Sequence, residues 1–339
     1  MSASYDPTPY YVPVVTVHPT KIIVHQEQVL GNRKAKQLET HKTNFQDNSH
    51  KGKISKKARK KISTALDYMM YLAKPKVIPE GYRGQGLKFK ICFVTLDLPS
   101  RQVHTDGQII SLVMEPMLNY FRKHYHVTNY IWRAEKQKNG NLHFHVILDK
   151  FIDKYELRRA WNKYLQNLGY VTAYKKNQLD WHNNGFTVRK KLLKHWPEQA
   201  QREAYLQGMK EDWNNPNTTD IHSTKRIKNL KKYLCKYLTK SRNEKILEEE
   251  INNSSTNDLL TISGRLWACS ESLSNIKGAK TDYTTEIDQE LLKITASQKS
   301  ELFQSSYYTV WCIYVTNLKY LDCPILTKLW NDYINTAFP

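Results

Sequence analysis

The sequence predicts an α+β fold in which helices flank a central antiparallel sheet, with extensions at both ends of the chain. Residues 87–96 and 142–148 alternate with a period of two, as strands with one buried face do. The second stretch follows a strand-like segment at about 128–136 after a short turn, which predicts a hairpin. Apolar residues also recur at helical spacing at about 108–124 and 153–167. Such helices bury one face against a sheet.

The chain begins with a polar arm and a basic helix. Residues 1 to about 50 contain few apolar runs, and we expect them to be partly disordered or draped over the main domain. A run rich in lysine, Lys51–Lys61, then leads into helical spacing with Ser55 as the N-cap, and Pro75 ends the helix. This face either grips phosphates or only keeps the protein soluble.

The middle of the chain continues with an insertion at about 169–216. It contains strand-like residues at 170–174 and helical spacing at about 197–210. A last short strand is predicted at 218–222, and a helix at 225–241 follows it.

The C-terminal part is mixed in character. We expect a helix at about 285–304 and a further strand within the apolar stretch Tyr307–Val315. The predicted division is a basic N-terminal arm and helix at 1–80, a main domain at 81–245 with its insertion near 169–216, and a C-terminal extension at 246–339.

Charge favours a nucleic acid as the partner. The 52 Lys and Arg residues outnumber the 32 Asp and Glu residues, which gives a formal charge of +20. The chain also has 22 Tyr and 8 Trp, and bases stack on aromatic rings. A polyanion with exposed bases therefore fits better than a membrane surface.

The cysteines and the hydropathy favour an intracellular, soluble protein. The five cysteines are scattered singly, without the spacing of a zinc site, and are expected to be reduced. The start of the chain lacks a leader, and no run of 18 apolar residues occurs. We expect the host cytoplasm, or the nucleus in a eukaryotic host, and no membrane partner.

Two histidines on one strand suggest a metal site. In a strand, His143 and His145 project to one face while the apolar residues between and beside them project to the other. An isolated pair of this kind also occurs in ordinary packing. A three-residue Lys138-Asn139-Gly140 loop with a glycine bulge would place Glu135 opposite His143, whereas a two-residue turn would bury its carboxylate in the core. We therefore predict the bulged turn and a site for a divalent cation on His143, His145 and Glu135.

The helix predicted at 225–241 carries two phenols on one face. At about 100° per residue, Tyr233, Lys236, Tyr237 and Lys240 fill an arc beside an apolar stripe. Tyrosine can act as a covalent nucleophile, and a nearby lysine stabilises a phenolate or neutralises a phosphate. The competing interpretation is a basic amphipathic helix whose tyrosines cover the edge of the core.

These residues, over roughly 88–242, resemble the HUH endonucleases, and specifically the rolling-circle replication initiators of plasmids and single-stranded DNA viruses. Three motifs carry the resemblance in the family's order: Phe93–Pro99, Trp132–Glu135 with His143–His145, and Tyr233-x-x-Lys236-Tyr237-x-x-Lys240. Asp97 departs from the first motif, where the family usually has threonine, so no catalytic role is given to it.

The resemblance implies a fold and a mechanism. The domain at 81–245 would be an HUH nicking and joining domain with a ferredoxin- or RRM-like sheet. Magnesium or manganese on the two histidines and Glu135 would polarise the scissile phosphate of single-stranded or stem-loop origin DNA. A tyrosine would attack to form a 5′-phosphotyrosine link, and the free 3′-OH would prime a host polymerase. Two tyrosines suggest the two-tyrosine branch, with Tyr233 or Tyr237 acting first or alone.

Unwinding would fall to a host helicase, because no GxxxxGK[ST] motif occurs. Two alternatives remain open. One is a relaxase or a transposase of the same fold. The other is a nucleic-acid-binding protein without activity, for which the charge and the aromatic residues suffice.

Overall fold

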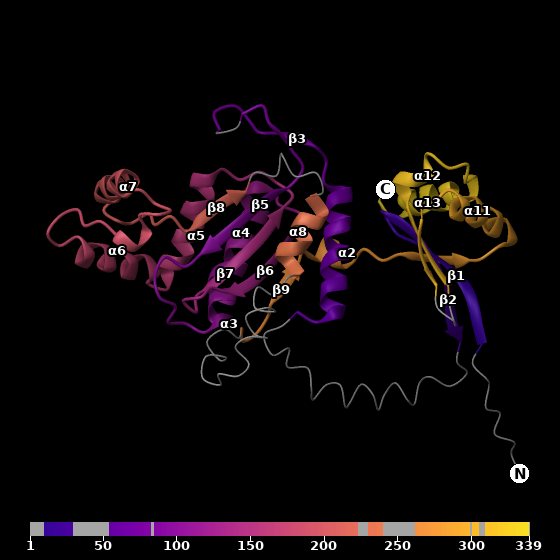
Figure 1. Ribbon diagram of the computed structural model, residues 1–339, viewed down its shortest axis with the longest axis horizontal. Coiled ribbons are helices and arrows are strands. Elements are labelled where there is room, and N and C mark those ends of the chain that lie inside the picture. Colours follow the sequence, from indigo (N-terminus) through magenta and orange to yellow (C-terminus); the bar gives the residue numbers. More distant parts are fainter. Residues whose placement is uncertain are drawn as a thin grey trace, which may run out of the picture. The chain divides into compact units, whose positions relative to one another are not determined.

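The computed structural model describes residues 10–29, 54–82, 85–222, 230–239, 262–298, 300–304 and 309–338. The chain divides into two compact units, one of Met1–Ser49 with Asn275–Pro339 and one of His50–Ser274. The predicted α+β class with antiparallel sheets is confirmed (Figure 1). The boundary predicted near residue 80 falls inside the second unit, which takes in the basic helix, and residues 262–274 also lie in that unit.

The larger unit is built on a five-stranded sheet in the order β8-β5-β7-β6-β9. Every neighbouring pair in it is antiparallel. The strands are β5 (Cys92–Asp97), β6 (Tyr130–Lys136), β7 (Leu142–Leu148), β8 (Thr219–His222) and β9 (Trp267–Cys269). A separate small ribbon pairs β3 (Lys76–Val77) with β4 (Lys88–Phe89).

One face of this sheet is an apolar core. Phe144 of β7 is fully buried, and its ring lies 5.9 Å from that of Trp161 on α5 (Lys154–Asn167). The Trp161 Nε1–H donates to the carbonyl of Asp97 at 2.8 Å, which ties the helix to the end of β5. The helix predicted at about 108–124 is a continuous run with a π-helical segment in its middle: α3 (Asp106–Ile109), η1 (Ile110–Met114) and α4 (Glu115–Tyr125).

The opposite face is covered by α2 (Lys56–Leu72) and α8 (Leu230–Thr239), which lie side by side (Figure 1). The N-cap of α2 is Ser55 as predicted, and its hydroxyl accepts from the Ala58 N–H at 3.1 Å. Leu234 and Leu238 of α8 are fully buried, so the apolar stripe of this helix meets the rest of the unit. The sheet is therefore sandwiched between helices.

The insertion is helical throughout its regular parts: α6 (Tyr170–Trp181), η2 (Lys190–Leu192) and α7 (Glu198–Lys210). The prediction of strand-like structure at 170–174 was wrong. Gly169 takes a left-handed conformation with φ of 79°, and the Gln166 side chain accepts from the Thr172 N–H at 3.0 Å. These contacts start a new helix directly after α5, and they override the β-propensity of the residues there. The helix predicted at about 197–210 is confirmed by α7.

The smaller unit pairs the two ends of the chain in a second five-stranded sheet, in the order β10-β1-β2-β12-β11. Its strands are β1 (Tyr10–Val17), β2 (Lys21–Val29), β10 (Ala279–Asp282), β11 (Glu301–Gln304) and β12 (Thr309–Tyr314). Its helices are α11 (Thr285–Ala296), α12 (Val315–Leu318) and α13 (Pro324–Ala337). The strand predicted within Tyr307–Val315 is confirmed, whereas the predicted 285–304 helix ends at Ala296.

The expectation of a partly disordered or draped arm is corrected for residues 10–29, which form a hairpin in this sheet. Val15, Ile22 and Ile313 are fully buried in one cluster with side chains from α11 and α13. The buried carboxylate of Glu290 accepts from the backbone N–H groups of Ile325 and Leu326 at 2.7 and 2.9 Å. It thereby caps the first turn of α13.

Candidate functional site

The β6–β7 turn has the predicted bulged form. Gly140 has φ of 82°, and the Gln137 N–H donates to the Asn141 carbonyl at 2.9 Å. Glu135 therefore lies opposite His143 in the ladder. The register prediction is confirmed, and the carboxylate shares a face with both histidines.

Glu135 is held between two neighbours on that face. Its Oε2 lies 3.4 Å from Nε2 of His145, and its Oε1 lies 3.3 Å from Nη1 of Arg133. All three side chains are largely buried. Arg133 also donates from Nη1 to the backbone carbonyl of Tyr237 at 3.2 Å, so one guanidinium joins the carboxylate to α8.

His143 is held by a residue to which the sequence analysis gave no role. Its Nδ1 lies 2.6 Å from Oδ1 of Asp97, which stands opposite it on β5. Gln137 also donates from Nε2 to the same carboxylate oxygen, at 2.5 Å. Asp97 is thus a residue of the site, although it departs from the usual threonine. Finding it required the pairing of β5 with β7, which no local pattern reveals.

Phe93 and His222 were likewise missed. The Phe93 ring stacks on His222 with centroids 4.6 Å apart, and it lies 5.5 Å from the Tyr237 ring. Phe93 is fully buried and forms part of the floor beneath α8. The period-two alternation of β5 placed its side chain on the same face as Thr95, but not under the tyrosines.

The phenols of α8 lie over the histidine strand. The Tyr237 and His145 rings are 5.5 Å apart, and the Tyr233 ring is 4.8 Å from that of Tyr237. Lys236 is exposed one residue before Tyr237. Lys240 and the predicted helical residues 225–229 lie outside the described part of the chain. The structure therefore brings together five of the seven predicted site residues, leaving Lys236 on the surface.

Burial and hydrogen bonds set the protonation states of this group. Burial lowers the pKa of His145, although its hydrogen bond with Glu135 opposes this shift. Burial alone would raise the pKa of Glu135, but the hydrogen bond from His145 and the charge of Arg133 outweigh it and lower that pKa. A neutral imidazole and a carboxylate result, which are the forms that bind metal ions. The hydrogen bond with Tyr237, together with burial, raises the pKa of Tyr233 to about 12.

The donor set suits a divalent cation by its chemistry, with two imidazoles and carboxylates on one face. His145 Nδ1 is buried and meets no hydrogen-bond partner in the described residues. The 3.4 Å between Glu135 and His145 exceeds the about 2.7–2.9 Å of a charge-assisted hydrogen bond. It is instead close to the about 3.0–3.4 Å between two ligands that each lie about 2.1 Å from one cation.

The site is nevertheless not a finished metal site. Across the described ranges, no three His, Cys, Asp or Glu side chains are grouped so as to hold an ion. Arg133 occupies one oxygen of Glu135, and Asp97 occupies one nitrogen of His143. Metal ligation by His143, His145 and Glu135 stays a prediction.

Comparison with known proteins places this face in a replication context. Residues 91–242 match a family model of the replication-associated proteins of the ORF2 type. The match lies within the larger unit and spans the His143 strand and the tyrosine helix. It supports a replication-associated protein of the Rep type, with DNA as its partner.

A search of curated proteins and a search of solved structures each found no significant match. Within the described residues, no helix is long and apolar enough to span a bilayer.

Proposed function

We propose that this protein is an HUH-type initiator of the two-tyrosine branch. It nicks and rejoins single-stranded origin DNA through a 5′-phosphotyrosine intermediate and so starts rolling-circle replication. One observation carries the proposal: the Tyr237 ring on α8 lies 5.5 Å from the His145 ring on β7. A nucleophile and a candidate metal ligand from distant parts of the sequence thus share one face of the sheet.

A divalent cation, magnesium or manganese, on His143, His145 and Glu135 would supply positive charge to the scissile phosphate. Asp97 holds the Nδ1 side of His143 and leaves the other ring nitrogen for ligation. Arg133 fixes Glu135 and the Tyr237 carbonyl together. Phe93 and the buried imidazoles exclude water from beneath the phenols, which strengthens electrostatic contacts there.

The nicking step is a transesterification. A phenol oxygen attacks phosphorus and loses its proton, the bond from phosphorus to the 3′ oxygen breaks, and that oxygen takes up a proton. One phosphate ester replaces another, so no ATP is consumed. Rejoining reverses the step when a 3′-OH attacks the phosphotyrosine.

We propose that Tyr237 attacks first. Its ring lies against His145, and a Tyr233 phenol that stays protonated can donate to the Tyr237 oxygen and stabilise the phenolate. Tyr233 then serves the second transfer. Lys236 and Lys240 would neutralise the flanking phosphates, and the free 3′-OH would be extended by a host polymerase while a host helicase unwinds the duplex.

A nicking assay on a panel of single-stranded and stem-loop oligonucleotides tests this function. Cleavage is expected with magnesium or manganese and should disappear with EDTA, leaving a covalent protein–DNA adduct only in the metal-containing reactions. Binding without cleavage under every condition would instead identify a nucleic-acid-binding protein without activity.

A further inference from the structure

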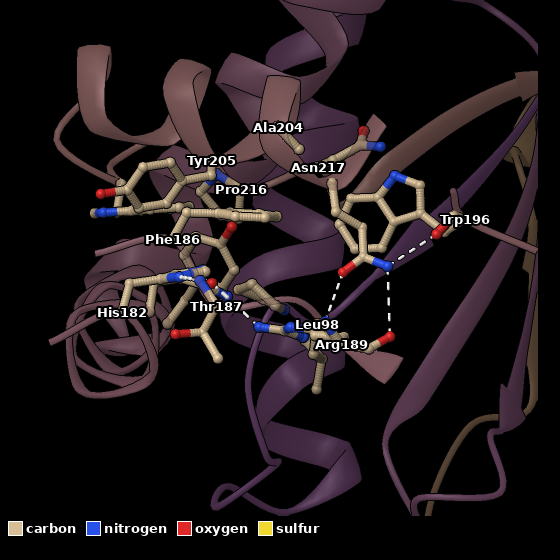
Figure 2. A pocket seen from close by; sticks show the side chains of 15 residues that line it. Leu98, His182, Phe186, Thr187, Arg189, Trp196, Ala204, Tyr205, Pro216 and Asn217 are labelled. Atoms are coloured by element: carbon tan, nitrogen blue, oxygen red, sulfur yellow. Dashed lines mark hydrogen bonds between the residues drawn. The ribbon is translucent and has the colours of Figure 1, made fainter. Parts of the chain in front are cut away.

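The insertion encloses a second cavity, of about 290 Å³, between α6, α7 and the ends of β5 and β8. Figure 2 shows His182, Phe186 and Tyr205 grouped on one side, with Trp196 across from them and Leu98 and Arg189 beneath. Ligand sites in proteins run from about 300 to 1,000 Å³. This cavity is at the small end of that range, so it suits one ring system rather than an extended ligand.

Aromatic rings form much of its wall. The His182 ring lies nearly parallel to that of Trp213, at 5.6 Å and 8°, and also nearly parallel to that of Phe186, at 6.1 Å and 14°. Tyr205 lies 4.7 Å from His182. Burial lowers the pKa of His182, so its ring is neutral. Neutral, parallel rings offer faces on which a planar ligand stacks.

Trp213 is held in place at an energetic cost. Asp212 and Trp213 both have left-handed backbones, with φ of 50° and 56°, which residues other than glycine rarely adopt. A Cβ on Gly208 would stand 2.1 Å from the indole, so only glycine fits beneath it. The Trp213 Nε1–H is buried without an acceptor in the described residues. Such costs collected at one side chain are more typical of a functional site than of simple packing.

The polar lining points to an anionic ligand with a neutral ring. No Asp or Glu lines the cavity, whereas Arg189, Asn217 and Thr187 do. Gln201 is buried, and its Oε1 accepts from the Arg189 N–H at 2.7 Å, which fixes the backbone of the arginine. A nucleobase with its phosphate combines these properties.

The cavity adjoins the candidate active site along the chain. Leu98 and Pro99 of its wall directly follow Asp97, and Asn217 stands two residues before β8. The Asp97 N–H donates to the Thr218 carbonyl at 2.8 Å, so both segments leave the sheet at the end where Asp97 meets His143. A strand bound at the tyrosines can therefore place a neighbouring base here.

We propose that this cavity receives one unpaired base of the single-stranded DNA substrate, a proposal that rests on the proposed function for its substrate class. The base stacks against the rings of His182, Trp213 and Tyr205, and Arg189 meets the adjacent phosphate. The insertion thereby adds a base-holding site to the nicking face.

Filling the cavity tests the proposal without touching the tyrosines. Ala204 lines the cavity from the exposed side of α7, so Ala204→Leu should fill it without disturbing the core. Gln207→Leu adds the same side chain on the same helix outside the cavity and is the matched control. Tyr205→Leu is a second variant, which removes a ring and keeps apolar bulk.

The measurement is fluorescence anisotropy in EDTA, where nicking cannot contribute, with an oligo-dT strand and an abasic strand of equal length. Stacking of one base is worth about tenfold in affinity. We expect wild type and Gln207→Leu to prefer oligo-dT, and this preference to fall about tenfold in Ala204→Leu and Tyr205→Leu, with abasic binding unchanged. Thymidine 5′-monophosphate serves as a competitor in a further arm.

An unchanged preference for bases in both cavity variants would overturn the proposal. So would a mononucleotide that binds the cavity while the variants leave oligo-dT affinity intact, because the ligand would then be a free nucleotide. The loss of base preference in a protein that nicks no oligonucleotide would support the cavity and contradict the proposed nicking. Normal nicking with no cavity effect would do the reverse.

Discussion

The Nδ1 atom of His143 lies 2.6 Å from Oδ1 of Asp97, across the β5–β7 ladder. This contact fixes the ring through the nitrogen that faces the carboxylate. An imidazole held in this way presents its other nitrogen in one orientation, as histidines that bind metals commonly do. Asp97 is therefore a positioning residue for the candidate cation site.

The first prediction concerns this contact. Asp97→Asn removes the charge that holds the His143 ring, and loss of such a partner typically lowers metal affinity by about 10–100-fold. Calorimetric titration with manganese measures the change. Asp180→Asn, which removes an exposed carboxylate on α6, should bind manganese as wild type does. Equal affinity in Asp97→Asn would show that the contact does not serve the site.

The second prediction concerns Arg133, which joins Glu135 to the carbonyl of Tyr237. Arg133→Met leaves a buried carboxylate without its cation and should lower the free energy of unfolding by about 3 kcal/mol. The double variant Arg133→Met/Glu135→Gln should recover part of this loss, because no buried charge is left unpaired. Urea unfolding provides the comparison.

A matched control for this prediction is Arg265→Met. Arg265 pairs with Glu115 at 3.6 Å, but both side chains are largely exposed. Its loss should therefore cost less than about 1 kcal/mol. If both arginine variants lost the same stability, the buried link would have no special role.

The third prediction concerns the bulged turn. Gly140 has φ of 82°, so Gly140→Ala forces a side chain into the left-handed region and should destabilise the protein by about 1 kcal/mol. Gly107→Ala is the control, because Gly107 lies in α3 with open space around its Cβ position and no positive φ. It should be neutral or slightly stabilising, as shown by thermal unfolding. A harmless Gly140→Ala would contradict the bulge.

The fourth prediction concerns acid. Burial lowers the pKa of His145, His182 and His222 from the ordinary 6.5. Below that pH the unfolded chain binds protons that the folded chain does not, so stability should fall as pH drops from 7.5 to 5.5. Melting temperatures in EDTA measure this fall. His222→Gln should reduce it, whereas His195→Gln, at an exposed position, should not. A melting temperature independent of pH would refute the account.

The predictable parts of the site were those fixed by local chemistry. The Lys138-Asn139-Gly140 loop contains its own register signal, because a one-residue shift would have buried the Glu135 carboxylate in the core. The position of Glu135 opposite His143 followed from that signal and is what the structure shows. The shared face of Tyr233 and Tyr237 likewise followed from helical spacing alone.

The rest depended on contacts between distant segments. Asp97 joins the site only because β5 pairs with β7, and nothing near Asp97 in the sequence specifies that partner. The hairpin of residues 10–29 buries Val15 and Ile22 against segments from the other end of the chain, so its local sequence looked merely polar. Residues 170–174 have β-forming side chains, but the Gln166 cap decides for helix.

Mass mapping of the covalent adduct tests the central claim most directly. The protein is incubated with a cleavable oligonucleotide and manganese and then digested, and the peptide carrying the nucleotide is sequenced. We predict that the phosphate is attached to Tyr237 in wild type, that it moves to Tyr233 or is lost in Tyr237→Phe, and that none forms in Tyr233→Phe/Tyr237→Phe. An adduct that persists in the double variant would contradict the assignment of the α8 tyrosines as nucleophiles.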